Sequence, residues 1–209
     1  VGAAWPRHFN RPIALAMDEN IKAVGLPAWS DDDQTFAKAL QRLMGSEENG
    51  LATELSGLEE PREQTVSAGS DDIGDVSWTV PTVTLRYPSN VQGMTAHHWS
   101  SAMAMATPIA HKGATAGAKV IAATLLDLLQ NEELRADAWR YYREEQLKDI
   151  EYEPFISADD PPAIEKNTET MAQFRERLRE HYYDPARYPT YLDQLGIDYP
   201  QLEKPSARR

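Results

Sequence analysis

The stretch from His111 to about Gln130 constrains the fold more than any other part of the chain. It is rich in alanine and glycine, with isoleucine and leucine as its larger apolar residues. These residues are Ala114, Ala116, Gly117, Ala118, Ala122 and Ala123, together with Ile121, Leu125, Leu128 and Leu129. A face of small side chains lets a helix lie close against a sheet, so the sequence predicts its longest helix here, with a sheet beside it.

Further helices are predicted from apolar residues at helical spacing and from residues that begin or end helices. They are residues 12–24, a helix capped by Ser30 and ended by Gly45, a helix capped by Asn131 that reaches about Leu147, and residues 168–182. A short helical turn is also predicted near Val76-Ser77-Trp78. Pro154, Pro161 and Pro162 mark a linker. We therefore divide the chain into residues 1–150 and a helical or irregular C-terminal extension, residues 151–209.

Residues 82–87 read Thr-Val-Thr-Leu-Arg-Tyr and form the best candidate strand. Residues that favour strands alternate there, and Pro88-Ser89-Asn90 ends the run. Loops that follow strands often carry functional groups. The residues just after this strand are therefore the first place to look for chemistry.

Charge and composition exclude several classes of protein. The net charge of −12 argues against a nucleic-acid binder and against docking on an anionic membrane, and no apolar run is long enough to span a membrane. The absence of cysteine excludes thiolate nucleophiles and cysteine-based zinc sites.

We expect a cytoplasmic protein. The chain begins at Val1 rather than methionine, so we expect a processed chain, a fragment or a renumbered sequence.

Two adjacent histidines, His97 and His98, follow the predicted strand and a Gly-Met-Thr-Ala turn. A neutral imidazole is a good ligand for zinc or manganese. Side chains of adjacent residues diverge in extended backbone, so we expect at most one of the two to bind a metal. The alternative is a pair of partly exposed loop histidines without a metal.

Two other motifs each leave two interpretations open. The acidic turn Asp71-Asp72-x-x-Asp75 can bind a cation, or Asp72 can cap the short helix that follows. His111-Lys112-Gly113 opens the long helix, where backbone N–H groups can hold an anion or simply begin the helix. Phosphate loops of the glycine-rich type, Gly-x-Ser-x-Gly and His-Glu-x-x-His are all missing from the sequence.

Three segments together resemble a known family. Gly69 to Trp78 resembles the stretch GSTDVGDVSW of the aminobenzoyl-glutamate hydrolase B-subunit type, within the aminoacylase/carboxypeptidase amidohydrolases of peptidase family M twenty. His97-His98-Trp99 followed by Ile109-Ala110-His111-Lys112-Gly113 resembles that group's HTW…IAHKG segment, and Asn20 to Trp29 resembles the return from its inserted domain. The resemblance covers roughly residues 10–160.

The resemblance implies an α/β fold, the C-terminal portion of a dinuclear-metal catalytic domain with a mixed sheet flanked by helices. It implies two divalent ions, zinc or manganese, and a glutamate that acts as general base on a metal-bound water. The family's last metal ligand in chain order is a C-terminal histidine, which corresponds here to His97. Asp71, Asp72 and His98 are assigned to substrate binding or to support of the ligands, and His111 to a structural role.

The family's other ligands are not identifiable, since no His-x-Asp occurs in the sequence. We therefore assign no catalytic residue to this chain and expect an N-terminal segment or chain to complete the site. We also expect an exposed apolar face if this piece is isolated, because the predicted sheet would be cut in half. A homo-oligomer formed through an inserted domain is expected as well.

Two functions follow. The first is part of an amidohydrolase that cleaves a small N-acyl or aminoacyl-amino acid or a short peptide. The second is a non-catalytic interaction subunit that keeps the fold.

Overall fold

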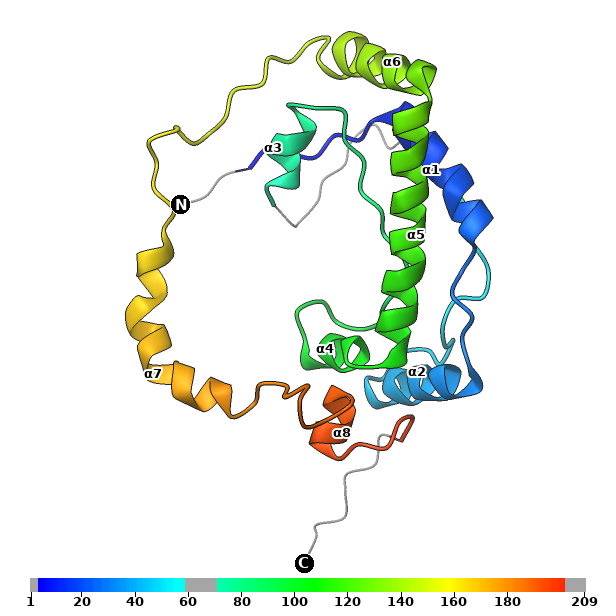
Figure 1. The fold of residues 1–209 in the computed structure, drawn as a ribbon, viewed down its shortest axis with the longest axis vertical. Coiled ribbons are helices and arrows are strands. Elements are labelled where there is room, and N and C mark those ends of the chain that lie inside the picture. The colour runs from blue at the N-terminus through cyan, green and yellow to red at the C-terminus, as the bar shows by residue number, and fades with distance from the viewer. Residues whose placement is uncertain (1–3, 59–70, 202–209) are drawn as a thin grey trace, which may run out of the picture. The chain divides into compact units, whose positions relative to one another are not determined.

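The computed structural model describes residues 4–58 and 71–201, and these residues are largely helical (Figure 1). The helices are α1 (Arg11–Val24), α2 (Asp31–Leu43), α3 (Ile73–Ser77), α4 (Trp99–Met105), α5 (Pro108–Gln130), α6 (Glu132–Tyr141), the π-helical turn η1 (Tyr142–Gln146), the 3-10 turn η2 (Ile164–Asn167), α7 (Thr168–Arg179) and α8 (Tyr191–Leu195). No helix among them combines the length and the apolar character that crossing a membrane requires.

The chain forms two compact units that alternate along the sequence. The first unit contains residues 1–28, 52–90 and 110–157, and the second contains residues 29–51, 91–109 and 158–209. Each unit is described by itself below. The division into residues 1–150 and 151–209 stays a prediction.

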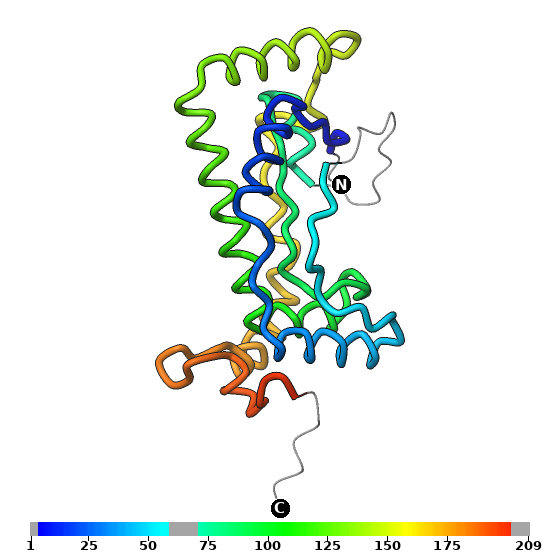
Figure 2. The backbone as a smooth tube through the Cα atoms, turned by 90° about the vertical axis from the view of Figure 1, so that its right-hand side faces the viewer, coloured from blue at the N-terminus to red at the C-terminus, as the bar shows by residue number. Residues whose placement is uncertain are grey.

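The predicted α/β fold with a mixed sheet is wrong, since the described residues contain no strand. Residues 82–87 are extended, but they run beside α1 rather than beside another strand (Figure 2). The Asn10 amide donates to the Thr82 carbonyl at 2.8 Å, and the Tyr87 hydroxyl donates to the Gly25 carbonyl. A strand needs a neighbouring strand to form its hydrogen-bond ladder. Residues 82–87 instead form single hydrogen bonds with residues at the two ends of α1.

The small-residue face of α5 contacts this extended segment, where a sheet was predicted. A Cβ atom added at Gly113 would collide with the Pro88 carbonyl and with Ser89. One added at Gly117 would lie 3.2 Å from the Tyr87 Cβ atom. The prediction of close packing is therefore confirmed, but its partner is a single extended segment.

Local sequence signals place the helix ends as predicted. The Ser30 side chain accepts from the Asp33 amide at 3.2 Å while the Asp33 carboxylate accepts from the Ser30 amide at 2.8 Å, a capping box for α2. The Asn131 side chain caps α6 by accepting from the Leu134 amide at 3.0 Å. Helix α5 begins at Pro108, three residues before the predicted start, and α4 and α8 were not predicted.

In the first unit, α1 packs against α6 through a buried polar link. Asn10 is fully buried, and its side-chain nitrogen donates to the Ala138 carbonyl at 2.9 Å. Helix α5 leaves Ile121, Leu125 and Leu129 exposed at a spacing of four residues. The apolar face was predicted to come from a divided sheet, which the described residues do not contain, so the exposed residues of α5 do not test that prediction.

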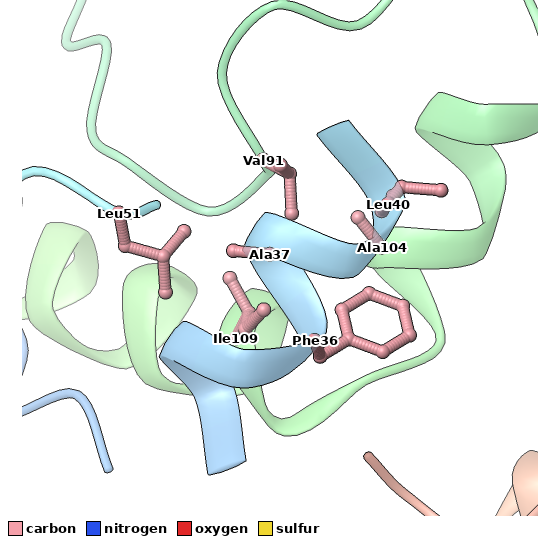
Figure 3. Packing of buried hydrophobic residues seen from close by; sticks show 7 residues of the cluster. All are labelled: Phe36, Ala37, Leu40, Leu51, Val91, Ala104 and Ile109. Carbon is pink, nitrogen blue, oxygen red and sulfur yellow. The ribbon is translucent and has the colours of Figure 1, made fainter. Parts of the chain in front are cut away.

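The hydrophobic core of the second unit joins α2, α4 and the loop that precedes α4 (Figure 3). Its buried members are Phe36, Ala37, Leu40, Leu51, Val91, Ala104 and Ile109. Val91 begins the loop that carries His97 and His98, so the core holds the start of that loop in place.

Candidate functional site

His97 lies in the loop that joins the core of the second unit to α4. Its backbone φ is 56°, in the left-handed region that few residues other than glycine adopt. Its side chain is exposed, and its imidazole makes no hydrogen bond to any residue within 4–58 or 71–201. An exposed imidazole without an internal partner is available as one donor to a metal ion.

The loop that carries His97 is held at three points. The buried Gln41 side chain donates to the Gln92 carbonyl at 3.2 Å, and the Ser46 hydroxyl donates to the Gly93 carbonyl at 2.9 Å. The Ser101 hydroxyl, from α4, donates to the Thr95 carbonyl at 3.0 Å. The backbone before His97 is thereby tied to α2, to the segment after α2 and to α4.

His98 has a structural task that the sequence did not predict, since it caps the N-terminus of α4. Its Nδ1 accepts from the Ser100 amide at 3.4 Å and lies 3.0 Å from the Ser100 hydroxyl. The cap therefore engages the Nδ1 nitrogen of His98 and leaves its Nε2 nitrogen outside the cap. The His97 ring has no comparable structural contact, and the roles predicted for His97 and His98 stay predictions.

The acidic turn belongs to the first unit, and two of its carboxylates, those of Asp71 and Asp75, have partners within that unit. Asp71 pairs with Arg7 at 3.2 Å and also accepts from the Ile73 amide at 3.2 Å. Asp75 accepts from the Tyr152 hydroxyl at 3.0 Å. Asp72 is the N-cap residue of α3, but its side chain makes no capping hydrogen bond, so the structure does not bear out the capping interpretation. The predicted roles of Asp71 and Asp72 near a substrate stay predictions.

The stretch from Gly74 to Trp78 is held tightly by packing. Gly74 lies so close to the Trp5 carbonyl that an added Cβ atom would overlap it. The Trp78 indole donates to the Pro6 carbonyl at 2.6 Å, and the Tyr142 hydroxyl donates to the Trp78 carbonyl at 2.6 Å. Close packing accounts for the glycine at position 74, and the indole hydrogen bond to Pro6 accounts for the tryptophan at position 78.

His8 lies beside this stretch and was missed by the sequence analysis. Its ring contacts the Trp78 ring, with 5.6 Å between centroids, and its Nδ1 is buried without a partner among the described atoms. Burial lowers the pKa of His8 below its ordinary value of 6.5. No motif marks this residue, because its environment is built by segments distant in sequence.

The described residues contain no group of three or more histidine, aspartate or glutamate side chains arranged to hold a metal ion. A structural zinc site takes four protein ligands and a catalytic one takes three. The described residues alone therefore do not form such a site, and the assignment of His97 as one ligand stays a prediction. His111, which is exposed in the first turns of α5, lies in the other unit.

One comparison with known proteins gives a match. The chain is similar to the B-subunit of the p-aminobenzoyl-glutamate hydrolase of Escherichia coli (strain K12), with 32% identity over 142 residues. The similarity covers 57% of this chain, and the chain spans about 30% of the length of that relative. The predicted closeness to this group is confirmed, and it is consistent with peptidase family M twenty.

The other comparisons give no match. No protein-family model matches the chain. No solved structure matches it either.

Proposed function

We propose that this chain is the C-terminal part of a metal-dependent amidohydrolase that cleaves an amide bond in a small substrate. The observation that carries the proposal is the similarity to a protein named as a hydrolase of p-aminobenzoyl-glutamate. The substrate class is an N-acyl or aminoacyl-amino acid or a short peptide. An N-terminal segment or chain supplies the remaining ligands and the general base, and an inserted domain makes the homo-oligomer.

In this proposal His97 gives one imidazole nitrogen to one of two divalent ions, zinc or manganese. Such ions lower the pKa of a bound water and polarise the amide carbonyl. The residues around His97 position it: Gln41 and Ser46 hold the preceding backbone, and His98 fixes the start of α4. The proposal takes His97 rather than His98 as the ligand because it lies two residues before Trp99, as in the resembling motif, and because the His98 ring has a structural role as the cap of α4.

The test is metal analysis of the assembled protein, with the N-terminal piece present. We expect two divalent ions per site in the parent, one in His97→Ala, and a large loss of amide hydrolysis. His98→Ala is the matched control, because it removes the cap of α4, at a cost of about 1 kcal/mol, yet should keep both ions. Two ions and full activity in His97→Ala would refute the assignment.

The alternative is a non-catalytic interaction subunit. It is supported by the C-terminal extension, residues 151–209, whose acidic and tyrosine side chains are of the kind that hold a partner protein. Intact mass and metal analysis of the native protein separate the two functions. An assembly without metal and without an N-terminal partner would support the alternative.

A further inference from the structure

The second unit contains a pocket of about 190 Å³ beside α4. Trp99 and Met103 of α4 form one wall, and Phe36 of α2 contributes to another. Residues 191–199 supply the rest of the lining, including Tyr191, Leu195 and Tyr199. The pocket is thus built from the core of the unit and from a segment more than 80 residues further along the chain.

Two contacts hold the 191–199 segment in place to form the pocket. The Tyr199 hydroxyl donates to the Asp33 carboxylate of α2 at 2.7 Å. The Tyr199 ring packs on Phe36, with 5.3 Å between the ring centroids. Without the docked segment, the pocket would lose the wall that Tyr191, Leu195 and Tyr199 provide.

The lining defines the class of ligand. It is apolar and aromatic and has no charged side chain, so a charged group would lose its hydration without gaining a partner. Both tyrosine hydroxyls of the lining already donate, Tyr199 to Asp33 and Tyr191 to the His181 carbonyl at 3.4 Å. The lining therefore offers ring faces and aliphatic carbon, which suit an uncharged aromatic ring.

The size agrees with this class. An engineered apolar cavity of about 150 Å³ in another protein binds benzene, and the present pocket is slightly larger. We propose that this pocket binds one uncharged aromatic ring of a small molecule, and that binding stabilises the docked 191–199 segment. The proposal does not rest on the amidohydrolase function, because ring binding is measured without metal or substrate.

The first test follows the fluorine NMR signal of fluorobenzene titrated with the full chain. We expect saturable line broadening, and binding at least tenfold weaker for benzoate, followed by displacement of fluorobenzene. Ala106→Phe places a ring in the pocket and should weaken fluorobenzene binding at least tenfold. Met105→Phe adds the same ring at an exposed neighbouring position of α4 outside the lining, and should leave binding unchanged.

A second variant keeps the test decisive if Ala106→Phe loses its helical circular dichroism. Ala102→Phe enters the same pocket from one turn earlier in α4 and should block binding in the same way. The proposal is overturned if fluorobenzene shows no saturable binding, or if a folded pocket-filling variant binds it as the parent does. It is equally overturned if only an apolar peptide, and no free ring, occupies the pocket.

The link to the C-terminal segment has its own readout. Tyr199→Phe keeps the ring but removes the hydrogen bond to Asp33, so fluorobenzene binding should weaken severalfold. Limited proteolysis within residues 181–190, which are mostly exposed and are hydrogen-bonded to Tyr191 and Gln194, should slow when fluorobenzene is added to the parent and not when it is added to Ala106→Phe. Equal cleavage rates with and without fluorobenzene in the parent would refute the coupling.

Discussion

Gln41→Leu is expected to destabilise the second unit and to loosen the loop that carries His97. The Gln41 side chain is almost fully buried, and its amide joins three segments. Its nitrogen donates to the Gly50 and Gln92 carbonyls, both at 3.2 Å, and its oxygen accepts from the Gly50 amide at 2.8 Å. Leucine has a similar volume and replaces none of these bonds.

The expected loss follows from the groups left without partners. Gly50 is buried, so its N–H and its carbonyl each cost about 1–3 kcal/mol when unsatisfied. The apolar leucine offsets about 1 kcal/mol of that loss. The net destabilisation is about 3 kcal/mol, which for a chain of this size lowers the Tm by about 6–12 °C.

Thermal unfolding followed by circular dichroism measures the change, and hydrogen exchange reports on residues 92–98. Exchange in that loop should be faster in Gln41→Leu, because the Gln92 carbonyl is no longer held. Ser46→Ala is the control, since it removes an exposed hydrogen bond to the same loop and should change the stability by less than about 0.5 kcal/mol. A Gln41→Leu variant as stable as Ser46→Ala would refute the reasoning.

Three further predictions concern the packing of each unit. Leu40 is fully buried, and Leu40→Ala should lower the free energy of unfolding, measured in urea, by about 2–5 kcal/mol. Leu129 is exposed, and Leu129→Ala should lower it by less than about 0.5 kcal/mol. Equal losses would contradict the described core. Gly74→Ala should lower the free energy of unfolding by about 1–3 kcal/mol, and with it the Tm, because the added Cβ atom meets the Trp5 carbonyl. An unchanged Tm would contradict that contact. Burial lowers the pKa of His8, so the unfolded chain binds its proton more readily, and stability should fall as the pH drops through 6.5. His8→Gln should flatten this dependence in unfolding measured from pH 7 to pH 5, and an unaltered slope would exclude His8 as its source.

The sequence by itself determined the helices whose ends are set by neighbouring residues. The Ser30 capping box and the Asn131 cap are formed within three or four residues, so a local pattern is enough to find them. Similarity to the hydrolase group was likewise visible in short motifs, in which His97 and Trp99 stand close together.

Only the tertiary structure decided whether residues 82–87 form a strand. Their alternation favours a strand, but a strand exists only where a second strand completes its ladder, and the hydrogen bonds here go to the ends of α1. The small-residue face of α5 is a local property, whereas the identity of what packs on it is not.

The same distinction holds at the candidate site. The sequence indicated both His97 and His98 as candidates. The structure gives them different environments, because the Nδ1 nitrogen of His98 is engaged in the cap of α4. The pocket beside Trp99 had no signal in the sequence, because Phe36 and Tyr199 meet only after the chain folds back on itself. Contacts between distant segments depend on the whole path of the chain, and a local pattern does not contain that path.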